Sequence, residues 1–460
     1  MNEYYDVKSF PVLPAMQHLS VPVPGSKSIT NRALLLAAMA DGTSVLRGCM
    51  SSEDAKVFLE CIHTLGFPIS ETPAAAELGL FSINKDITIT GFGGKIPAKK
   101  AEIYVGSAGT AARFLVAMLA LSDGEYVVRS SEQMQKRPMQ PLIDALQDAG
   151  AMVVCMEEAG HFPMKIFGRE LVRRTTGAPE EHSGEPVRFK VNIDQSSQFL
   201  SALLIAAGTL KEPAEIEVVG SHGLSYVDLT ARMLENFGVS AEKEENDGKI
   251  SYRLPGDQHY RAGTYDIEAD MSAAAYFYAL AAVLGIRVSV NGVRREMLQG
   301  DIAFLKVLEQ MGCSISGGVF GQDLSVTGPE GGKLKGDLTV DMSAFSDQAL
   351  TLAAIAPYAD GPVTITGIGH IRLQECDRIR AIAENLTALG VTVEEQEDRV
   401  TISPGQMHGA EIQTYEDHRV AMAFSLCGLR TEGVRILNPG CCKKTFAEYF
   451  TILDYLLKKL

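Results

Sequence analysis

Three polar residues near the N-terminus, Lys27, Ser28 and Arg32, have the types and the spacing of an anion-binding site. They follow a Pro24-Gly25 turn and open an apolar run, 33–40, which predicts a helix beginning near Lys27. The first N–H groups of a helix have no partner within it, and the helix dipole favours negative charge there. Ser28 and Arg32 are four residues apart and therefore share a helix face. The segment predicts a phosphate or carboxylate site; the alternative is an ordinary helix cap with solvated cations.

A nucleoside-triphosphate loop is excluded by the order of residues in this segment. Such a loop needs glycine, four residues, and then Gly-Lys-Ser/Thr. Here the order is Gly-Ser-Lys-Ser over 25–28, and 16–23 contains no glycine.

Further basic, hydroxyl and amide side chains occur where other helices are expected to begin. They are Arg113 after Gly106-Ser107-Ala108-Gly109-Thr110, Lys136 and Arg137, Ser196, Ser197 and Gln198, Arg378, Arg419, and Lys443 and Lys444. Glycines such as Gly109 would let a ligand approach the backbone closely. Each group alone is also consistent with a solvated cation, but their recurrence in an acidic chain favours a cleft that binds polyanions.

Two acids, Asp347 and Glu375, are candidates for proton transfer. Asp347 precedes an apolar helix, and Glu375 stands three residues before Arg378. If both share a cleft with Lys27, the three side chains can serve as general acid and general base. The alternative is that both acids only cap helices.

The composition restricts the class of protein. The chain has 460 residues, of which 46% are hydrophobic and 22% charged, as in globular proteins with more than one hydrophobic core. The net charge of −15 argues against a nucleic-acid or anionic-membrane surface. No apolar run approaches the roughly 18 residues that span a bilayer, and no signal peptide is visible, so we expect a cytoplasmic protein.

The cysteines and histidines give no sign of a metal site or a disulfide framework. The eight cysteines are scattered, apart from the adjacent pair Cys441-Cys442, and no Cys-x-x-Cys spacing occurs. The nine histidines show no metal-binding spacing either. We expect no metal and no cofactor.

A unit of two helices and several strands recurs six times along the chain. An apolar, alanine-rich helix starts near Gly25, Gly106, Asp194, Asp270, Asp341 and Asp417. A more amphipathic helix follows each, within 53–66, 139–150, 226–238, 301–312, 375–390 and 445–460. The two interleaved series predict an α/β repeat protein with two halves of three units, joined near 255–263. The alternative is an α/β protein whose helices are spaced regularly by chance.

With these motifs, the sequence closely resembles the 5-enolpyruvylshikimate-3-phosphate synthases (3-phosphoshikimate 1-carboxyvinyltransferases), which are enolpyruvyl transferases. The resemblance covers nearly the whole chain. It rests on six motifs in order: PGSKSxxNR at 24–32, GSAGTAAR at 106–113, QSSQFL at 195–200, ECDR at 375–378, DHR at 417–419 and KTF at 444–446.

The resemblance implies a fold of two similar globular domains with the substrate cleft between them. Each domain has three β-α-β-α-β-β repeats and forms an inside-out α/β barrel. One domain would hold 1–25 with 263–460, the other would hold 26–262, and the chain would cross near 22–26 and 256–264. We expect a monomer with small-molecule substrates only.

The resemblance also implies an activity and its residues. The enolpyruvyl group of phosphoenolpyruvate would pass to the 5-hydroxyl of shikimate 3-phosphate through a tetrahedral intermediate with loss of phosphate, in the shikimate pathway to chorismate and the aromatic amino acids. Asp347 would take the hydroxyl proton, and Glu375, with Lys27, would protonate the methylene carbon. Shikimate 3-phosphate would be bound by Lys27, Ser28, Arg32, Ser196, Ser197, Ser225, Asp347 and Gln374. Phosphoenolpyruvate would be bound by Lys27, Gly109, Arg137, Gln198, Arg378, Arg419 and Lys444.

Three positions depart from the family's pattern. Ser107 and His370 stand where the family often has asparagine, and Gln374 stands where it often has lysine. The change at Gln374 removes a positive charge expected near shikimate 3-phosphate. Glyphosate is expected to compete with phosphoenolpyruvate, because Gly109 leaves room for it, while Ser107 and Phe114 alter the surrounding helix.

Two other functions are weighed against this one. The sister enzyme that acts on UDP-N-acetylglucosamine normally has a cysteine in its mobile loop and Lys-Asn at the opening motif. This chain has no cysteine in 130–141 and has Lys27-Ser28. A non-catalytic polyanion-binding relative is disfavoured by the presence of Lys27, Asp347 and Glu375 together.

Overall fold

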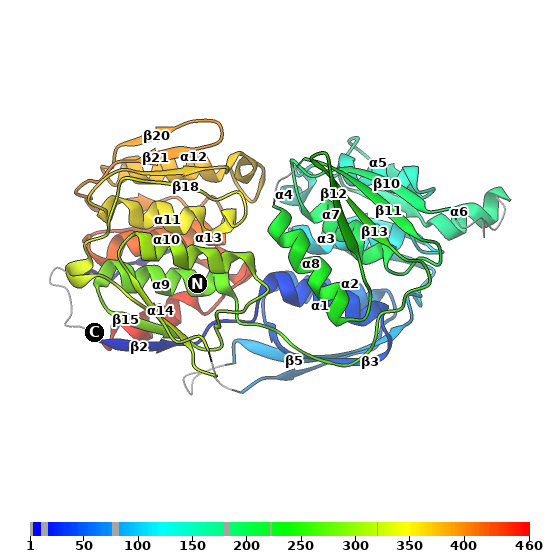
Figure 1. Ribbon diagram of the computed structural model, residues 1–460, viewed down its shortest axis with the longest axis horizontal. Helices are drawn as coiled ribbons and strands as arrows, with labels where there is room; N and C mark the ends of the chain where they lie inside the picture. The colour runs from blue at the N-terminus through cyan, green and yellow to red at the C-terminus, as the bar shows by residue number, and fades with distance from the viewer. Residues whose placement is uncertain (1–2, 11–16, 76–81, 178–184, 221–222, 320) are drawn as a thin grey trace. The chain divides into compact units, whose positions relative to one another are not determined.

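The computed structural model describes all residues except 1–2, 11–16, 76–81, 178–184, 221–222 and 320. The chain divides into two compact units (Figure 1). The first unit comprises the described residues of Met1–Ser26, Ala75–Ile83 and Glu268–Leu460; the second comprises those of Lys27–Ala74 and Asn84–Ile267.

The second unit contains three sheets and eight helices among its described residues. Its strands are β3 (Asp41–Met50), β4 (Ile69–Pro73), β5 (Asn84–Phe92), β6 (Lys100–Tyr104), β7 (Glu125–Arg129), β8 (Met152–Cys155), β9 (Met164–Phe167), β10 (Val187–Asn192), β11 (Ala214–Val219), β12 (Glu242–Asn246), β13 (Lys249–Leu254) and β14 (Thr264–Asp266). Its helices are α1 (Lys27–Met39), α2 (Glu53–Thr64), α3 (Gly109–Ala120), α4 (Glu132–Gln135), α5 (Gln140–Asp148), α6 (Arg169–Thr176), α7 (Gln198–Ala207) and α8 (Leu224–Asn236).

The first unit repeats this plan. Its strands are β1 (Tyr4–Asp6), β2 (His18–Val21), β15 (Arg287–Val290), β16 (Ser314–Ser316), β17 (Leu324–Thr327), β18 (Leu338–Asp341), β19 (Val363–Thr366), β20 (Val393–Glu395), β21 (Val400–Ile402), β22 (Glu411–Ile412) and β23 (Arg435–Leu437). Its α-helices are α9 (Met271–Leu284), α10 (Phe304–Gln310), α11 (Ala349–Ile355), α12 (Arg378–Ala388), α13 (His418–Phe424) and α14 (Tyr449–Leu457). Short 3₁₀ turns flank several of them, namely η1 (Gly300–Ala303), η2 (Glu330–Gly332), η3 (Ser346–Gln348), η4 (Ala356–Tyr358), η5 (Gly369–Leu373), η6 (Ser425–Leu429) and η7 (Pro439–Lys444).

The twelve helices of the two predicted series are all present, and the mixed α/β fold class is confirmed. The β-α-β-α-β-β order is clearest in the runs from β6 to β9, from β10 to β13 and from β18 to β21. In each resulting sheet the first two strands are parallel and the remaining pairings are antiparallel.

Two strands, β2 and β14, lie where the chain passes between the units, and each pairs with a strand of the unit that the chain is leaving. β2 directly precedes α1 in sequence, yet it pairs in parallel with β15 of the first unit. β14 precedes α9, yet it pairs in parallel with β3 of the second unit. Apart from the described residues of Ala75–Ile83, which also belong to the first unit, the units change at Ser26–Lys27 and at Ile267–Glu268, the latter a few residues beyond the range 256–264. The N-terminal β1 pairs with β23 and thereby completes the last sheet.

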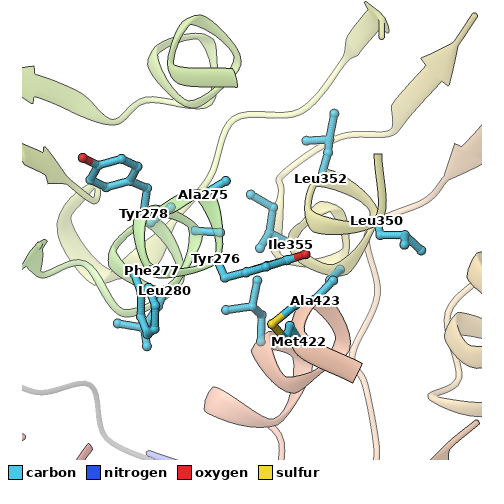
Figure 2. Close-up of a cluster of buried hydrophobic side chains, with 14 of the residues drawn as sticks. Ala275, Tyr276, Phe277, Tyr278, Leu280, Leu350, Leu352, Ile355, Met422 and Ala423 are labelled. Carbon is cyan, nitrogen blue, oxygen red and sulfur yellow. The ribbon is translucent and has the colours of Figure 1, made fainter. Parts of the chain in front are cut away.

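The character of each helix explains its position. Every residue of α3 and α11 is buried, and in α9 all but Ser272 are buried. A helix that is apolar on all sides is stable only when other elements surround it. Figure 2 shows α9, α11 and α13 packed together in the first unit through side chains such as Tyr276, Ile355 and Met422. The amphipathic series instead buries one face, as α5 does with Leu142, Ile143 and Leu146.

Local signals set the ends of the central helices. Asp270 caps α9, with its carboxylate Oδ1 accepting a hydrogen bond from Ala273 N at 2.9 Å. Gly285 ends the helix with a left-handed φ of 68°, a conformation that costs glycine little. Within the described residues, no helix is long and apolar enough to cross a membrane.

Candidate active site

The guanidinium of Arg378 is the centre of the polar cluster in the first unit. Its Nε lies 2.7 Å from Asp417 Oδ2, its Nη1 lies 3.3 Å from Asp347 Oδ1, and its Nη2 lies 3.0 Å from Glu375 Oε2. Nη1 also donates to Gln374 Oε1. The Arg378 side chain is only 2% exposed. The two acids predicted for proton transfer therefore share one buried cation.

Two further cations complete this cluster. Arg419 Nη2 donates to Asp347 Oδ2 at 2.7 Å. Lys444 Nζ lies 3.2 Å from Glu375 Oε1, but the geometry is not that of a hydrogen bond, and this buried ammonium has no hydrogen-bond partner among the described residues. Lys444 thus keeps hydrogen-bonding capacity for an incoming anion.

The charges of the cluster fix the protonation of Arg378. Burial alone would lower the pKa of its guanidinium, but the carboxylates of Asp417, Glu375 and Asp347 outweigh burial and raise it. Burial also raises the pKa of Tyr276, which lies near Arg419 and Arg378, so its phenol is a neutral hydroxyl. Acidic and basic side chains held at fixed positions around one site are the arrangement that stabilises a developing charge without reorganisation.

Helix caps position the cations of this cluster. Asp377 caps α12, and its Oδ1 accepts from Arg380 N at 3.0 Å, so Arg378 occupies the first helical position. Asp417 caps α13 by accepting from Arg419 N at 2.8 Å while it also holds Arg378. The N-cap of α12 is therefore Asp377 rather than the predicted candidate Glu375, whose carboxylate instead faces cations.

Two of the positions that depart from the family pattern lie beside this cluster. His370 Nε2 and Ser346 Oγ are 2.7 Å apart, which connects η5 to the turn that carries Asp347. Gln374 accepts from Arg378 through its amide oxygen. An ammonium at position 374 could not accept that bond.

In the second unit, Lys27 is the first residue of α1 and forms an ion pair with Asp54 of α2. Lys27 Nζ lies 3.0 Å from Asp54 Oδ2, and the side chains are 19% and 4% exposed. Ser52 caps α2 by accepting from Ala55 N at 3.2 Å, which fixes the turn that carries Asp54. The alternative of a solvated lysine is wrong for Lys27.

Arg32 is buried and bonded within the second unit. Its guanidinium donates to Thr230 Oγ1 at 2.7 Å, Ser28 O at 2.9 Å, Tyr226 O at 3.1 Å and Ser201 Oγ at 3.3 Å. Burial lowers its pKa to about 10, so it stays charged at neutral pH. These contacts use four of its five N–H groups, so Arg32 anchors α1 to α7 and α8.

Two arginines converge on Gly109 at the start of α3. A Cβ atom on Gly109 would lie 2.5 Å from Arg137 Nη1 and 3.0 Å from Arg113 Nη1. Arg113 Nη1 in turn donates to Gln198 Oε1 at 2.7 Å. Two guanidiniums, an amide and a helix N-terminus at one place are groups that favour a small anion.

The remaining predicted hydroxyls lie at helix starts of the second unit. Ser196 Oγ accepts from Gln198 N at 3.3 Å, and Ser197 is the N-cap of α7. Ser225 is the second residue of α8, and Ser28 the second of α1.

The predicted residues therefore form two groups, one in each unit. The first unit brings together Asp347, Glu375, Arg378, Arg419, Lys444 and Gln374, and the second unit holds Lys27, Ser28, Arg32, Gly109, Arg137, Ser196, Ser197, Gln198 and Ser225. The sequence analysis named Arg113 only among the recurring basic groups and gave it no substrate, and it assigned no site role to Asp54 or Asp417. Arg113 and Asp417 lie within the motifs at 106–113 and 417–419, which could have indicated their roles, whereas Asp54 lies in no motif.

Comparison with known proteins agrees with the motifs. A family profile described as EPSP synthase (3-phosphoshikimate 1-carboxyvinyltransferase) matches residues 14–453. A 3-phosphoshikimate 1-carboxyvinyltransferase of Trichormus variabilis is 43% identical over 448 residues, which cover 97% of this chain and 98% of that protein. A 3-phosphoshikimate 1-carboxyvinyltransferase 2 of Halalkalibacterium halodurans is 38% identical over 462 residues, which cover 98% of this chain and 95% of that protein.

A solved structure agrees as well. The EPSP synthase of Acinetobacter baumannii matches with a TM-score of 0.75 and 25% identity, covering 99% of this chain and 98% of that one. The fold, with two helix series and small mixed sheets, and the acid-and-cation cluster define an α/β enzyme that handles anionic substrates. The chain belongs to the EPSP synthase family.

Proposed function

We propose that this protein transfers the enolpyruvyl group of phosphoenolpyruvate to the 5-hydroxyl of shikimate 3-phosphate and releases phosphate. The observation that carries the proposal is the pair of acids, Asp347 and Glu375, held on one buried Arg378. The family and the names of its members support the same reaction.

The reaction needs an acid, a base and fixed cations. Glu375, with Lys27, protonates the methylene carbon of phosphoenolpyruvate, which leaves positive charge on the neighbouring carbon. The 5-hydroxyl oxygen attacks that carbon while Asp347 accepts its proton. The resulting tetrahedral intermediate then loses a methyl proton and phosphate, which restores the carbon–carbon double bond.

The cations bind the two anionic substrates. We assign the carboxylate and phosphate of phosphoenolpyruvate to the arginines and lysines around Gly109 and Arg378, because arginine binds planar or tetrahedral oxyanions through paired bonds. The residues that we assign to phosphoenolpyruvate are Lys27, Gly109, Arg137, Gln198, Arg378, Arg419 and Lys444. For shikimate 3-phosphate the set is Lys27, Ser28, Arg32, Ser196, Ser197, Ser225, Asp347 and Gln374.

The activity is tested by measuring phosphate release from purified protein. We expect release only when phosphoenolpyruvate and shikimate 3-phosphate are both present. UDP-N-acetylglucosamine is the matched alternative acceptor. Turnover with that acceptor, or none with shikimate 3-phosphate by folded protein, would exclude the proposal.

We expect Gly109→Ala to weaken the use of phosphoenolpyruvate. The new methyl group would lie 2.5 Å from Arg137 Nη1, so the guanidinium must move away. Loss of one charge-assisted hydrogen bond, about 1.5–3 kcal/mol, corresponds to a rise in the KM of phosphoenolpyruvate of roughly tenfold or more. Inhibition by glyphosate should weaken in the same variant.

The control for this variant is Gly405→Ala. A Cβ at Gly405 meets no heavy atom within 4 Å, so its KM should stay at the value of the unmodified enzyme. An unchanged KM in Gly109→Ala, with Gly405→Ala also unchanged, would show that Arg137 does not bind this substrate.

A further inference from the structure

A third acid, Asp301, contacts η3, the turn that carries Asp347. Asp301, in η1, is 4% exposed and belongs to none of the substrate-binding sets. Its Oδ1 accepts hydrogen bonds from Gln348 Nε2 at 2.9 Å and from Ser272 Oγ at 3.3 Å. A carboxyl group buried to this degree is costly unless its neighbours satisfy it, so its presence requires an explanation.

The contact with Gln348 connects Asp301 to the position of Asp347. Gln348 is fully buried and directly follows Asp347 in η3. Its Nε2 donates to Asp301, and its Oε1 accepts from Thr351 Oγ1 at 3.3 Å, so both ends of its amide are used. Asp301 and Thr351 therefore fix the turn from which the Asp347 carboxylate reaches Arg378 and Arg419.

Electrostatics connects the two acids as well. The pKa of Asp301 is raised to about 6, chiefly by burial and then by the charge of Asp347. Gln348 and Arg419 act in the opposite direction, and Asp270 adds a smaller rise. Coupling between two titrating groups is reciprocal, so a charge on Asp301 also disfavours the charge on Asp347.

We propose that Asp301 is a positioning residue for Asp347: through Gln348 it holds the turn that carries the base, and its negative charge makes that base a stronger proton acceptor. This inference rests on the proposed role of Asp347 in the transfer reaction. Asp301 itself contacts no substrate in this role.

Two variants separate the charge from the hydrogen bond. Asp301→Asn keeps an oxygen that can accept from Gln348 but removes the charge, so we expect a small fall in kcat at neutral pH, where Asp301 is charged in the unmodified protein. Gln348→Met keeps the size of the side chain and removes the bond, so we expect a larger fall in kcat, about tenfold, with little change in either KM. Asp323→Asn is the control, because Asp323 binds Arg294 and Gly292 N elsewhere in the first unit.

A titration that needs no activity completes the test. In protein labelled with carbon-13 at the aspartate carboxyls, the Asp301 signal is assigned by its loss in Asp301→Asn. We expect its titration midpoint to be lower in Asp347→Asn than in the unmodified protein and unchanged in Asp323→Asn. An identical midpoint in Asp347→Asn, or a full kcat in Gln348→Met, would overturn the proposal. If the unmodified protein lacked the transfer activity, the proposed function would fail while this titration still decided the coupling.

Discussion

Replacement of Asp347 by asparagine should lower kcat by roughly 10²- to 10⁴-fold, the usual contribution of a general base. The carboxamide has nearly the size of the carboxylate but cannot accept the proton of the 5-hydroxyl. The dissociation constants of both substrates should change much less than kcat, because Arg378 and Arg419 remain in place. Steady-state kinetics, together with equilibrium binding of shikimate 3-phosphate, measures the two effects separately.

The matched control for Asp347→Asn must also remove a carboxylate that is paired with an arginine. Asp323 meets that condition, with its Oδ1 2.6 Å from Arg294 Nη1. Asp323→Asn should retain full turnover. If Asp347→Asn lost binding and turnover in equal measure, Asp347 would be a structural partner of the two arginines and not a base.

Replacement of Lys27 by methionine should damage binding and chemistry together. Lys27 is proposed to contact both substrates and to share in protonating the methylene carbon, so we expect kcat to fall and both KM values to rise. Near-normal turnover would contradict this role most directly. The measurement is a full two-substrate kinetic analysis at saturating concentrations of the fixed substrate.

The ion pair with Asp54 makes a second readout necessary for Lys27→Met. The substitution leaves the nearly buried Asp54 carboxylate without its cation, and breaking a buried pair in this way typically costs about 3–5 kcal/mol of unfolding free energy. Adding Asp54→Asn to Lys27→Met should restore much of that stability without restoring turnover. Recovery of turnover in the double variant would mean that Lys27 serves only to balance Asp54.

Much of the fold could be predicted from the sequence because its signals are local. Apolar runs, capping acids such as Asp270 and terminal glycines such as Gly285 mark helices wherever they occur in the chain. The pairing of β2 and of β14 has no such signal. Both strands are short, and each directly precedes a helix of the other unit. Only the pairing with a distant partner, β15 for β2 and β3 for β14, shows to which unit the strand belongs.

The candidate site also has a part that the sequence predicts and a part that it does not. Motifs identify residues that are consecutive or one helical turn apart, as in Gly106–Arg113 or Glu375–Arg378. The partners of these residues come from other elements, so spacing along the chain does not predict them. Asp54, which pairs with Lys27 from α2, and Asp301, which holds Gln348 from η1, both lie in segments that no motif singled out.

The most direct measurement follows the bridging oxygen of phosphoenolpyruvate through one turnover. With oxygen-18 at the bridge between carbon and phosphorus, transfer of the enolpyruvyl group breaks the carbon–oxygen bond. We therefore predict that the label appears in inorganic phosphate and that the product keeps the phosphate of shikimate 3-phosphate and gains three carbons. Label retained in pyruvate, or a second phosphate on the acceptor, would mean that the enzyme transfers phosphate and that the proposed function is wrong.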